Sequence, residues 1–81
     1  MRARVYVPLK PGVPDPAGKA VQGGLHHLGY TEVHGVRLGK FFEIEIEDRA
    51  DARERLDEMC RKLLANMVIE SYRIELPSGA A

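Results

Sequence analysis

The segment FEIEIE, residues 42–47, alternates apolar and acidic side chains as clearly as any part of the chain. Successive side chains of a β-strand point to opposite faces, so this alternation predicts a strand with one apolar and one acidic face. The apolar face must be buried, and the acidic face must be solvated or paired with basic groups.

A second strand is predicted near the N-terminus, in the segment RVYVPL, residues 4–9. Its apolar face is formed by Ala3, Val5, Val7 and Leu9. Pro8 cannot donate a hydrogen bond to a neighbouring strand and therefore indicates a free edge nearby. The final segment VIESYRIEL, residues 68–76, predicts a third strand with Val68, Tyr72, Ile74 and Leu76 on one face.

Two helices are predicted between these strands. The first begins at the N-cap Asp15, followed by Pro16, and ends at Gly29, which suits a left-handed C-terminal turn. The second runs over residues 48–66 with an apolar stripe at helical spacing. Gly23 and Gly24 each cost the first helix about 1 kcal/mol relative to alanine, so we expect a sheet or a neighbouring subunit to approach closely there.

The connection between the helices, residues 33–47, carries two extended segments separated by Gly39 and Lys40. It is either a hairpin turning at these two residues or one long bent strand. The element order predicts an α+β fold, a β-α-β-β-α-β two-layer sandwich with two helices on one face of a mainly antiparallel four-stranded sheet. Residues 1–76 would form this single domain, and residues 77–81 a flexible tail.

Composition narrows the classes of partner. At 81 residues, the chain buries a small core, so oligomerisation is expected. Twelve basic and twelve acidic residues cancel, which argues against general nucleic-acid or anionic-membrane binding. The single Cys60 excludes an internal disulfide, and no apolar block could form a signal or a membrane span. We therefore expect a cytoplasmic protein.

No catalytic motif emerges from the residues alone. The segment LKPGVPDPAGKAV, residues 9–21, lacks the spacing and the hydroxyl of a phosphate-binding loop. The spacing of the histidines is not that of a metal site. Cys60 lies on the apolar stripe of the second helix, which favours a buried thiol over a nucleophile. The acidic strand lacks the exposed aromatic residues of an RNA-binding sheet. Lys10, Arg37 and Lys40, at strand ends or turns, either aid solubility or dock a partner.

Three blocks in this order and spacing, LKPGVPDPAGKAV, VHGVRLGKFFEI and LLANMVIESYRIE, resemble the PurS family, the small subunit of phosphoribosylformylglycinamidine (FGAM) synthase. The resemblance covers nearly the whole chain. Two departures affect local geometry: Pro14 replaces a common aliphatic residue, and Met67 replaces a common proline.

The resemblance implies a non-catalytic subunit in purine biosynthesis. The complex converts formylglycinamide ribonucleotide, glutamine and ATP to FGAM, glutamate, ADP and phosphate. A homodimer, or a tetramer, would assemble the glutaminase and synthetase subunits and aid ammonia transfer. This chain would bind no cofactor or metal, and ATP and magnesium would bind the synthetase. The residues expected at the partner interface are Lys10, Asp15, Arg37, Gly39, Lys40 and Asn66.

Two other functions remain open. The first is a small-molecule-binding regulatory module of similar topology, with an amino acid or a nucleotide between subunits. The second is an acylphosphatase-like hydrolase, for which the proline-rich first loop lacks the anion-binding donors.

Overall fold

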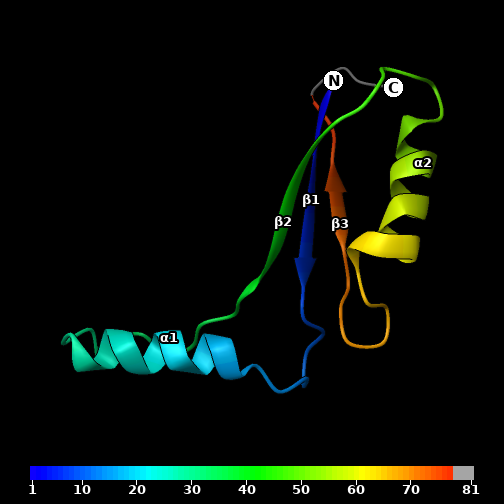
Figure 1. Cartoon of the computed structure of the whole chain (residues 1–81). Coiled ribbons are helices and arrows are strands. Elements are labelled where there is room, and N and C mark those ends of the chain that lie inside the picture. Colours follow the sequence, from blue (N-terminus) through cyan, green and yellow to red (C-terminus); the bar gives the residue numbers. More distant parts are fainter. Residues whose placement is uncertain (78–81) are drawn as a thin grey trace.

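The computed structural model describes residues 1–77 and shows an α+β fold. Three strands, β1 (Arg2–Pro8), β2 (Gly39–Glu45) and β3 (Arg73–Glu75), form an antiparallel sheet in the order β2-β1-β3 (Figure 1). The helices are α1 (Pro16–His27) and α2 (Ala52–Met59), and α2 continues into a π-helical turn, η1 (Cys60–Leu64). The predicted α+β class and the antiparallel sheet are confirmed.

The core lies between the sheet and α2. Val5 and Val7 on β1 are fully buried against Cys60 and Ala65, and Phe42 and other partly buried residues pack around this cluster. The apolar residues of β1 and β2 therefore face the core, as their alternation with polar residues predicts. Ala52 and Leu56 fix α2 in place, because both are completely buried.

The second helix is shorter than predicted. It begins at Ala52 rather than Asp48, because residues 50–51 form a turn in which the Ala52 amide donates to the Arg49 carbonyl. The Arg49 side chain also forms a double hydrogen bond with Asp51. Its regular part ends at Met59, and η1 ends at Leu64 rather than Asn66.

The prediction of a four-stranded sheet is wrong for residues 1–77, where the sheet has three strands. The last strand covers only Arg73–Glu75, preceded by an isolated bridge between Glu70 and Leu9. Residues 66–70 form a turn instead, because the amides of Ile69 and Glu70 both donate to the carbonyl of Asn66. The expected tail lies outside the described residues, except for Pro77.

The expected hairpin at Gly39 and Lys40 is also wrong. Both residues lie inside β2, paired with Pro8 and Val7 of β1. Residues 33–38 form no strand, so a single long bent strand is not found either. Because the chain passes straight from residue 38 into β2, this segment cannot fold back against β2.

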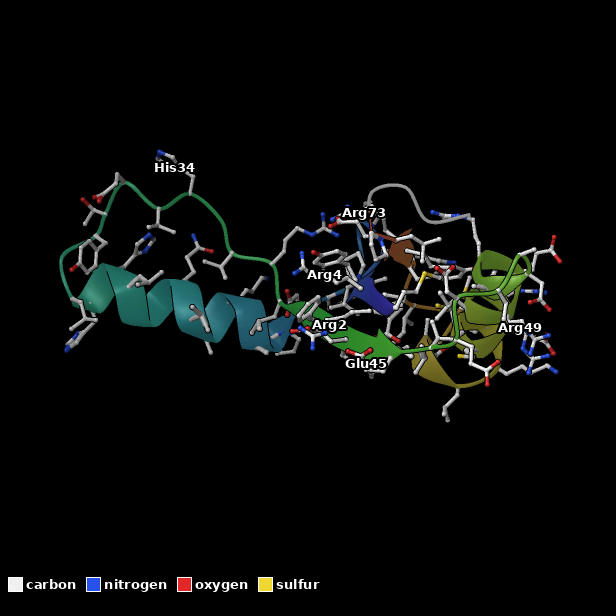
Figure 2. All side chains as sticks on the ribbon, turned by 90° about the horizontal axis from the view of Figure 1, so that it is seen from above. Arg2, Arg4, His34, Glu45, Arg49 and Arg73 are labelled. Atoms are coloured by element: carbon white, nitrogen blue, oxygen red, sulfur yellow. The ribbon has the colours of Figure 1, made fainter. Side chains whose placement is uncertain are left out.

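The first helix begins and ends as predicted, but it does not pack on the face of the sheet where it was expected (Figure 1). The Asp15 carboxylate caps it, and Gly29 adopts a left-handed φ of 101° after the C-cap Leu28. Figure 1 shows α1 leading away from one end of the sheet, and Figure 2 shows α1 and α2 on opposite sides of the strands. The prediction that both helices cover one face is therefore wrong for the single chain.

Candidate partner-binding site

The six residues expected at the partner interface gather at one end of the sheet, where β1 ends and β2 begins. Lys10 and Asp15 lie between β1 and α1, and Arg37 lies in the segment before β2. Gly39 and Lys40 begin β2, and Asn66 follows η1. We call this region, residues 9–15, 36–40 and 64–70, the loop end of the molecule.

Asp15 connects two segments of the loop end. One carboxylate oxygen, Oδ1, accepts from the Gly18 amide at 2.8 Å, and Oδ2 accepts from the Leu38 amide at 3.2 Å. These two hydrogen bonds, with a smaller contribution from the charge of Arg37, lower the pKa of Asp15 below its ordinary value. Asp15 is therefore a structural clamp between the start of α1 and the start of β2.

Lys10 and Arg37 bond to backbone carbonyls. Lys10 Nζ donates to the Met67 carbonyl at 2.6 Å, and its amide donates to the Ile69 carbonyl at 2.8 Å. Arg37 Nη2 donates to the Leu9 carbonyl at 2.5 Å. Each side chain has further N–H donors beyond these bonds, so both cations can hold the loops and still meet an acidic partner.

Lys40, Asn66 and Glu70 form the third set of contacts. Lys40 Nζ donates to the Leu64 carbonyl at 3.0 Å and lies 3.2 Å from Glu70 Oε1. That same oxygen accepts from the Asn66 amide at 2.7 Å. The Asn66 amide and then Lys40 lower the pKa of Glu70. Position 39 has no room for a side chain, because a Cβ on Gly39 would lie only 2.8 Å from the Val7 carbonyl oxygen.

The loop end also carries three consecutive apolar residues, of which the sequence interpretation placed the last two, Val68 and Ile69, in a strand. Met67, Val68 and Ile69 are exposed, and Val68 most of all, with 81% of its surface accessible. We call them the apolar turn. The residue before them, Asn66, gave a usable signal, because its side chain accepts from the Val68 amide in a turn geometry typical of asparagine.

The acidic face of β2 is paired with a basic side chain, which is one of the two arrangements that the sequence left open. Arg2 Nε lies 2.9 Å from Glu45 and 3.5 Å from Glu43, and Figure 2 labels Arg2 and Glu45 on this face. Tyr6 stacks on Phe41 with ring centroids 5.1 Å apart, and the Arg73 guanidinium lies 4.3 Å from the Tyr6 ring. A hollow of about 540 Å³ adjoins these rings.

In residues 1–77, the potentially reactive side chains either lie apart from one another, form other contacts, or are buried. No three His, Cys, Asp or Glu side chains in this part of the chain group in a way that could hold a metal ion. His26 Nε2 lies 2.6 Å from the Val33 carbonyl oxygen. Cys60 is fully buried, and burial, followed by the charge of Asp57, raises the pKa of its thiol. None of the helices described is both long and apolar enough to cross a bilayer.

The family profile and the related sequences all point to the same protein family. The sequence profile of the family described as "PurS: Phosphoribosylformylglycinamidine (FGAM) synthase" matches residues 2–78. The phosphoribosylformylglycinamidine synthase subunit PurS of Bacillus subtilis is 53% identical over 82 residues, which cover 99% of this chain and 96% of the relative. The Synechocystis subunit PurS is 55% identical over 75 residues, 90% of this chain and 75% of the relative.

Solved structures extend this similarity to the fold. The C2 crystal form of B. subtilis PurS superposes with a TM-score of 0.83 at 52% identity, covering 91% of this chain and 94% of that chain. A chain in the structure of PurLQS from Thermotoga maritima gives a TM-score of 0.80 at 29% identity, covering 91% of this chain and 93% of that one.

Proposed function

This chain belongs to the PurS family of FGAM synthase, and on that premise we propose that it is the small subunit that holds the glutaminase and synthetase subunits together. The observation that carries the proposal is its similarity, over most of both chains, to a chain of the Thermotoga maritima PurLQS structure. In that role the chain takes part in purine biosynthesis as a non-catalytic accessory subunit.

The state of Cys60 supports a non-catalytic role. Glutamine hydrolysis through a cysteine requires an accessible thiolate beside a base. Cys60 is buried, and its surroundings favour the neutral thiol. The proposal therefore assigns glutamine hydrolysis to the glutaminase subunit, and ATP and magnesium to the synthetase subunit. Placed between them, this subunit would aid ammonia transfer by fixing the two active sites relative to each other.

We propose that the loop end is the surface that docks these partners. Its three segments are joined by Asp15, Lys10 and Lys40, so little conformational entropy is lost when a partner binds. The apolar turn supplies exposed hydrophobic contacts, and the neighbouring cations supply charge. An apolar centre with a charged rim is the usual anatomy of a protein interface.

Val68→Glu tests this surface directly. The Val68 side chain is 81% exposed and packs little within its own chain, so the substitution should leave the fold unchanged. A charge placed in an apolar interface should raise the dissociation constant of the complex with the glutaminase and synthetase about tenfold or more. Sedimentation velocity of the mixed subunits measures this. Thr31→Glu, exposed and far from the loop end, is the control, and equal binding by both variants would refute the assignment.

We also propose that the chain is a homodimer in the cytoplasm, where ATP and glutamine are available. Its radius of gyration is 16.0 Å, whereas a compact domain of this length is expected near 12 Å. Within residues 1–77, the outer edges of β2 and β3 pair with no further strand and much of α1 is exposed, and a second copy could cover these surfaces. A tetramer is the alternative assembly, which sedimentation equilibrium distinguishes from a dimer by mass.

The second candidate function is a small-molecule regulatory module. The hollow beside Tyr6, Phe41 and Arg73 favours it, because stacked rings and a guanidinium suit a planar anionic ligand. Calorimetry of the isolated chain with ATP, glutamine and other amino acids tests it. Micromolar binding would support this module, whereas an assembly subunit should bind none of them tightly.

A further inference from the structure

The outer face of the sheet, which also carries the glutamates of β2, holds aromatic side chains on two neighbouring strands. Val5 and Val7 of β1 are buried in the core, so Tyr6 between them points to the outer face. Phe41 of β2 is the direct cross-strand partner of Tyr6, and it is 50% exposed. The acidic strand read by itself shows only one of these rings, because the other ring comes from β1.

Three planar side chains line up across the three strands. The ring centroids of Tyr6 and Phe41 are 5.1 Å apart, and the guanidinium of Arg73 lies 4.3 Å from the Tyr6 ring on the β3 side. These distances are close to the spacing of about 4.8 Å between neighbouring strands, so the three groups form one continuous row on the sheet. We call this row, Phe41, Tyr6 and Arg73, the aromatic ridge.

The next row of the outer face, toward the loop end, carries only small side chains. Pro8 of β1 pairs with Gly39 of β2, and the Pro8 carbonyl accepts from the Ser71 amide at 3.0 Å. A low row beside the aromatic ridge leaves the hollow of about 540 Å³, which residues of both rows line. A hollow of this volume lies within the range of small-molecule sites.

The charges on the outer face limit what this hollow can bind. Arg73 Nη1 donates to Glu75 at 2.9 Å, which leaves the other N–H groups of this guanidinium for a ligand. Arg4 has Glu43 and Glu75 as its cross-strand partners, and Figure 2 labels Arg4 and Arg73 on the sheet. One guanidinium among glutamates suits a planar ring with a single anionic group, and it disfavours a chain of phosphates.

We propose that the hollow binds a nucleoside monophosphate, with its base against the aromatic ridge and its phosphate on Arg73. Aromatic side chains bind the π-face of any base, and a guanidinium forms paired hydrogen bonds with phosphate oxygens. The inference rests on the second candidate function proposed above and specifies its ligand. Because Gly39 and Lys40 border both the hollow and the loop end, the nucleotide would lie beside the surface proposed to dock the partners.

Calorimetry of the full chain with AMP and matched probes tests the ligand class. AMP should bind, whereas adenosine, which lacks the phosphate, and ribose 5-phosphate, which lacks the base, should each bind about tenfold more weakly or less. ATP should also bind about tenfold more weakly, because its additional charges meet the glutamates. A single strand of six adenylates tests the other source of a base. Binding of this strand more than about tenfold tighter than AMP would overturn the proposal in favour of a nucleic acid.

Two variants test the assigned residues. Phe41→Ala should weaken AMP binding about tenfold or more, because the base loses a ring to pack against. Arg73→Gln should weaken AMP binding to a similar extent but leave adenosine binding unchanged, because only AMP carries the phosphate. Tyr30→Ala is the control for Phe41→Ala, since Tyr30 is 51% exposed and lies outside the sheet. Unchanged AMP binding by Phe41→Ala would overturn the site.

A fluorescent reporter tests the site without removing a ring. The chain has no tryptophan, so Phe41→Trp places a single indole beside the hollow. AMP should quench its fluorescence and leave that of Tyr30→Trp unchanged, and equal signals from the two variants would refute the assignment. Binding of an amino acid without binding of AMP would contradict only the nucleotide site. If neither binds, the regulatory module fails as well, and the assembly role still stands on its own test.

Discussion

Single residues at the loop end have more than one role. Asp15 caps α1 and also holds the Leu38 amide, and Lys10 bonds two carbonyls of residues 66–70. The residues predicted from the sequence as partner contacts are thus, first of all, the residues that shape the surface. Their role in binding partners stays a prediction, which Val68→Glu tests without disturbing these bonds.

Among the glycines of residues 1–77, Gly18 has the least room for a side chain. A Cβ there would lie 2.5 Å from the Val36 carbonyl oxygen and would also collide with the Asp15 carboxylate. Gly18→Ala should therefore push the segment around Val36 away from α1 and destabilise the protein by about 1–3 kcal/mol. Gly23→Ala is the matched control, because its Cβ meets nothing within 4 Å and should stabilise α1 by up to about 1 kcal/mol. Thermal unfolding of both variants measures the contrast, and equal shifts would contradict the assigned clash.

The carboxylates of Asp15 and Glu70 predict a loss of stability in acid. Their pKa values in the folded chain lie below the ordinary values of 3.8 and 4.5, so the unfolded chain binds protons first as pH falls. The stabilisation is complete above about pH 5 and is lost as pH falls through the folded pKa values. Urea unfolding between pH 7 and pH 2 measures this. In the double variant Asp15→Asn with Glu70→Gln, the free energy of unfolding should fall less steeply between pH 5 and pH 2. An unchanged pH dependence would show that other groups cause the loss of stability in acid.

At the scale of elements, α2 and β1 form the stable part of the fold. Leu56 is fully buried against the sheet, whereas Leu63, seven positions further along, is almost fully exposed. The π-helical turn between Cys60 and Leu64 changes the direction of the last side chains, so Leu63 points away from the core while Cys60 and Leu64 still pack in or against it.

Leu56→Ala and Leu63→Ala separate folding from assembly. Loss of the buried Leu56 side chain should destabilise the protein by about 2–5 kcal/mol. Leu63→Ala should change the stability of the monomer by less than about 0.5 kcal/mol. It should nevertheless weaken the proposed homodimer, since the exposed Leu63 offers an apolar surface that a second copy can cover. Urea unfolding at a low and a high protein concentration measures both effects, and a Leu63→Ala dimer as strong as wild type would contradict this contact.

The sequence predicted elements with strong local signals and missed those decided by distant contacts. Asp15, Pro16 and Gly29 place the ends of α1 correctly because caps are local chemistry. The hairpin at Gly39 failed because pairing with Pro8 extends the chain there, and no local residue type reveals a partner 31 positions away. Of the six residues expected at the partner interface, Lys10, Arg37 and Lys40 were chosen for their places at strand ends or turns, and the other three were chosen from the family resemblance. The apolar turn was missed because VIE is also typical of a strand.

At the scale of the whole molecule, the chain is elongated, with principal extents of 48 × 27 × 15 Å. A small domain usually closes its core within one chain, yet here α1 leads away from the sheet (Figure 1). This shape suits a subunit that connects others, because it leaves surface that partner chains can cover.

Reconstitution with purified subunits tests the central claim most directly. The rate of FGAM formation is measured with glutamine, and separately with ammonium, for the glutaminase and synthetase with and without this chain. We expect the glutamine-dependent rate to require the chain, the ammonium-dependent rate of the synthetase to be nearly independent of it, and the chain alone to turn over nothing. A full glutamine-dependent rate in its absence, or turnover by the chain alone, would contradict the account.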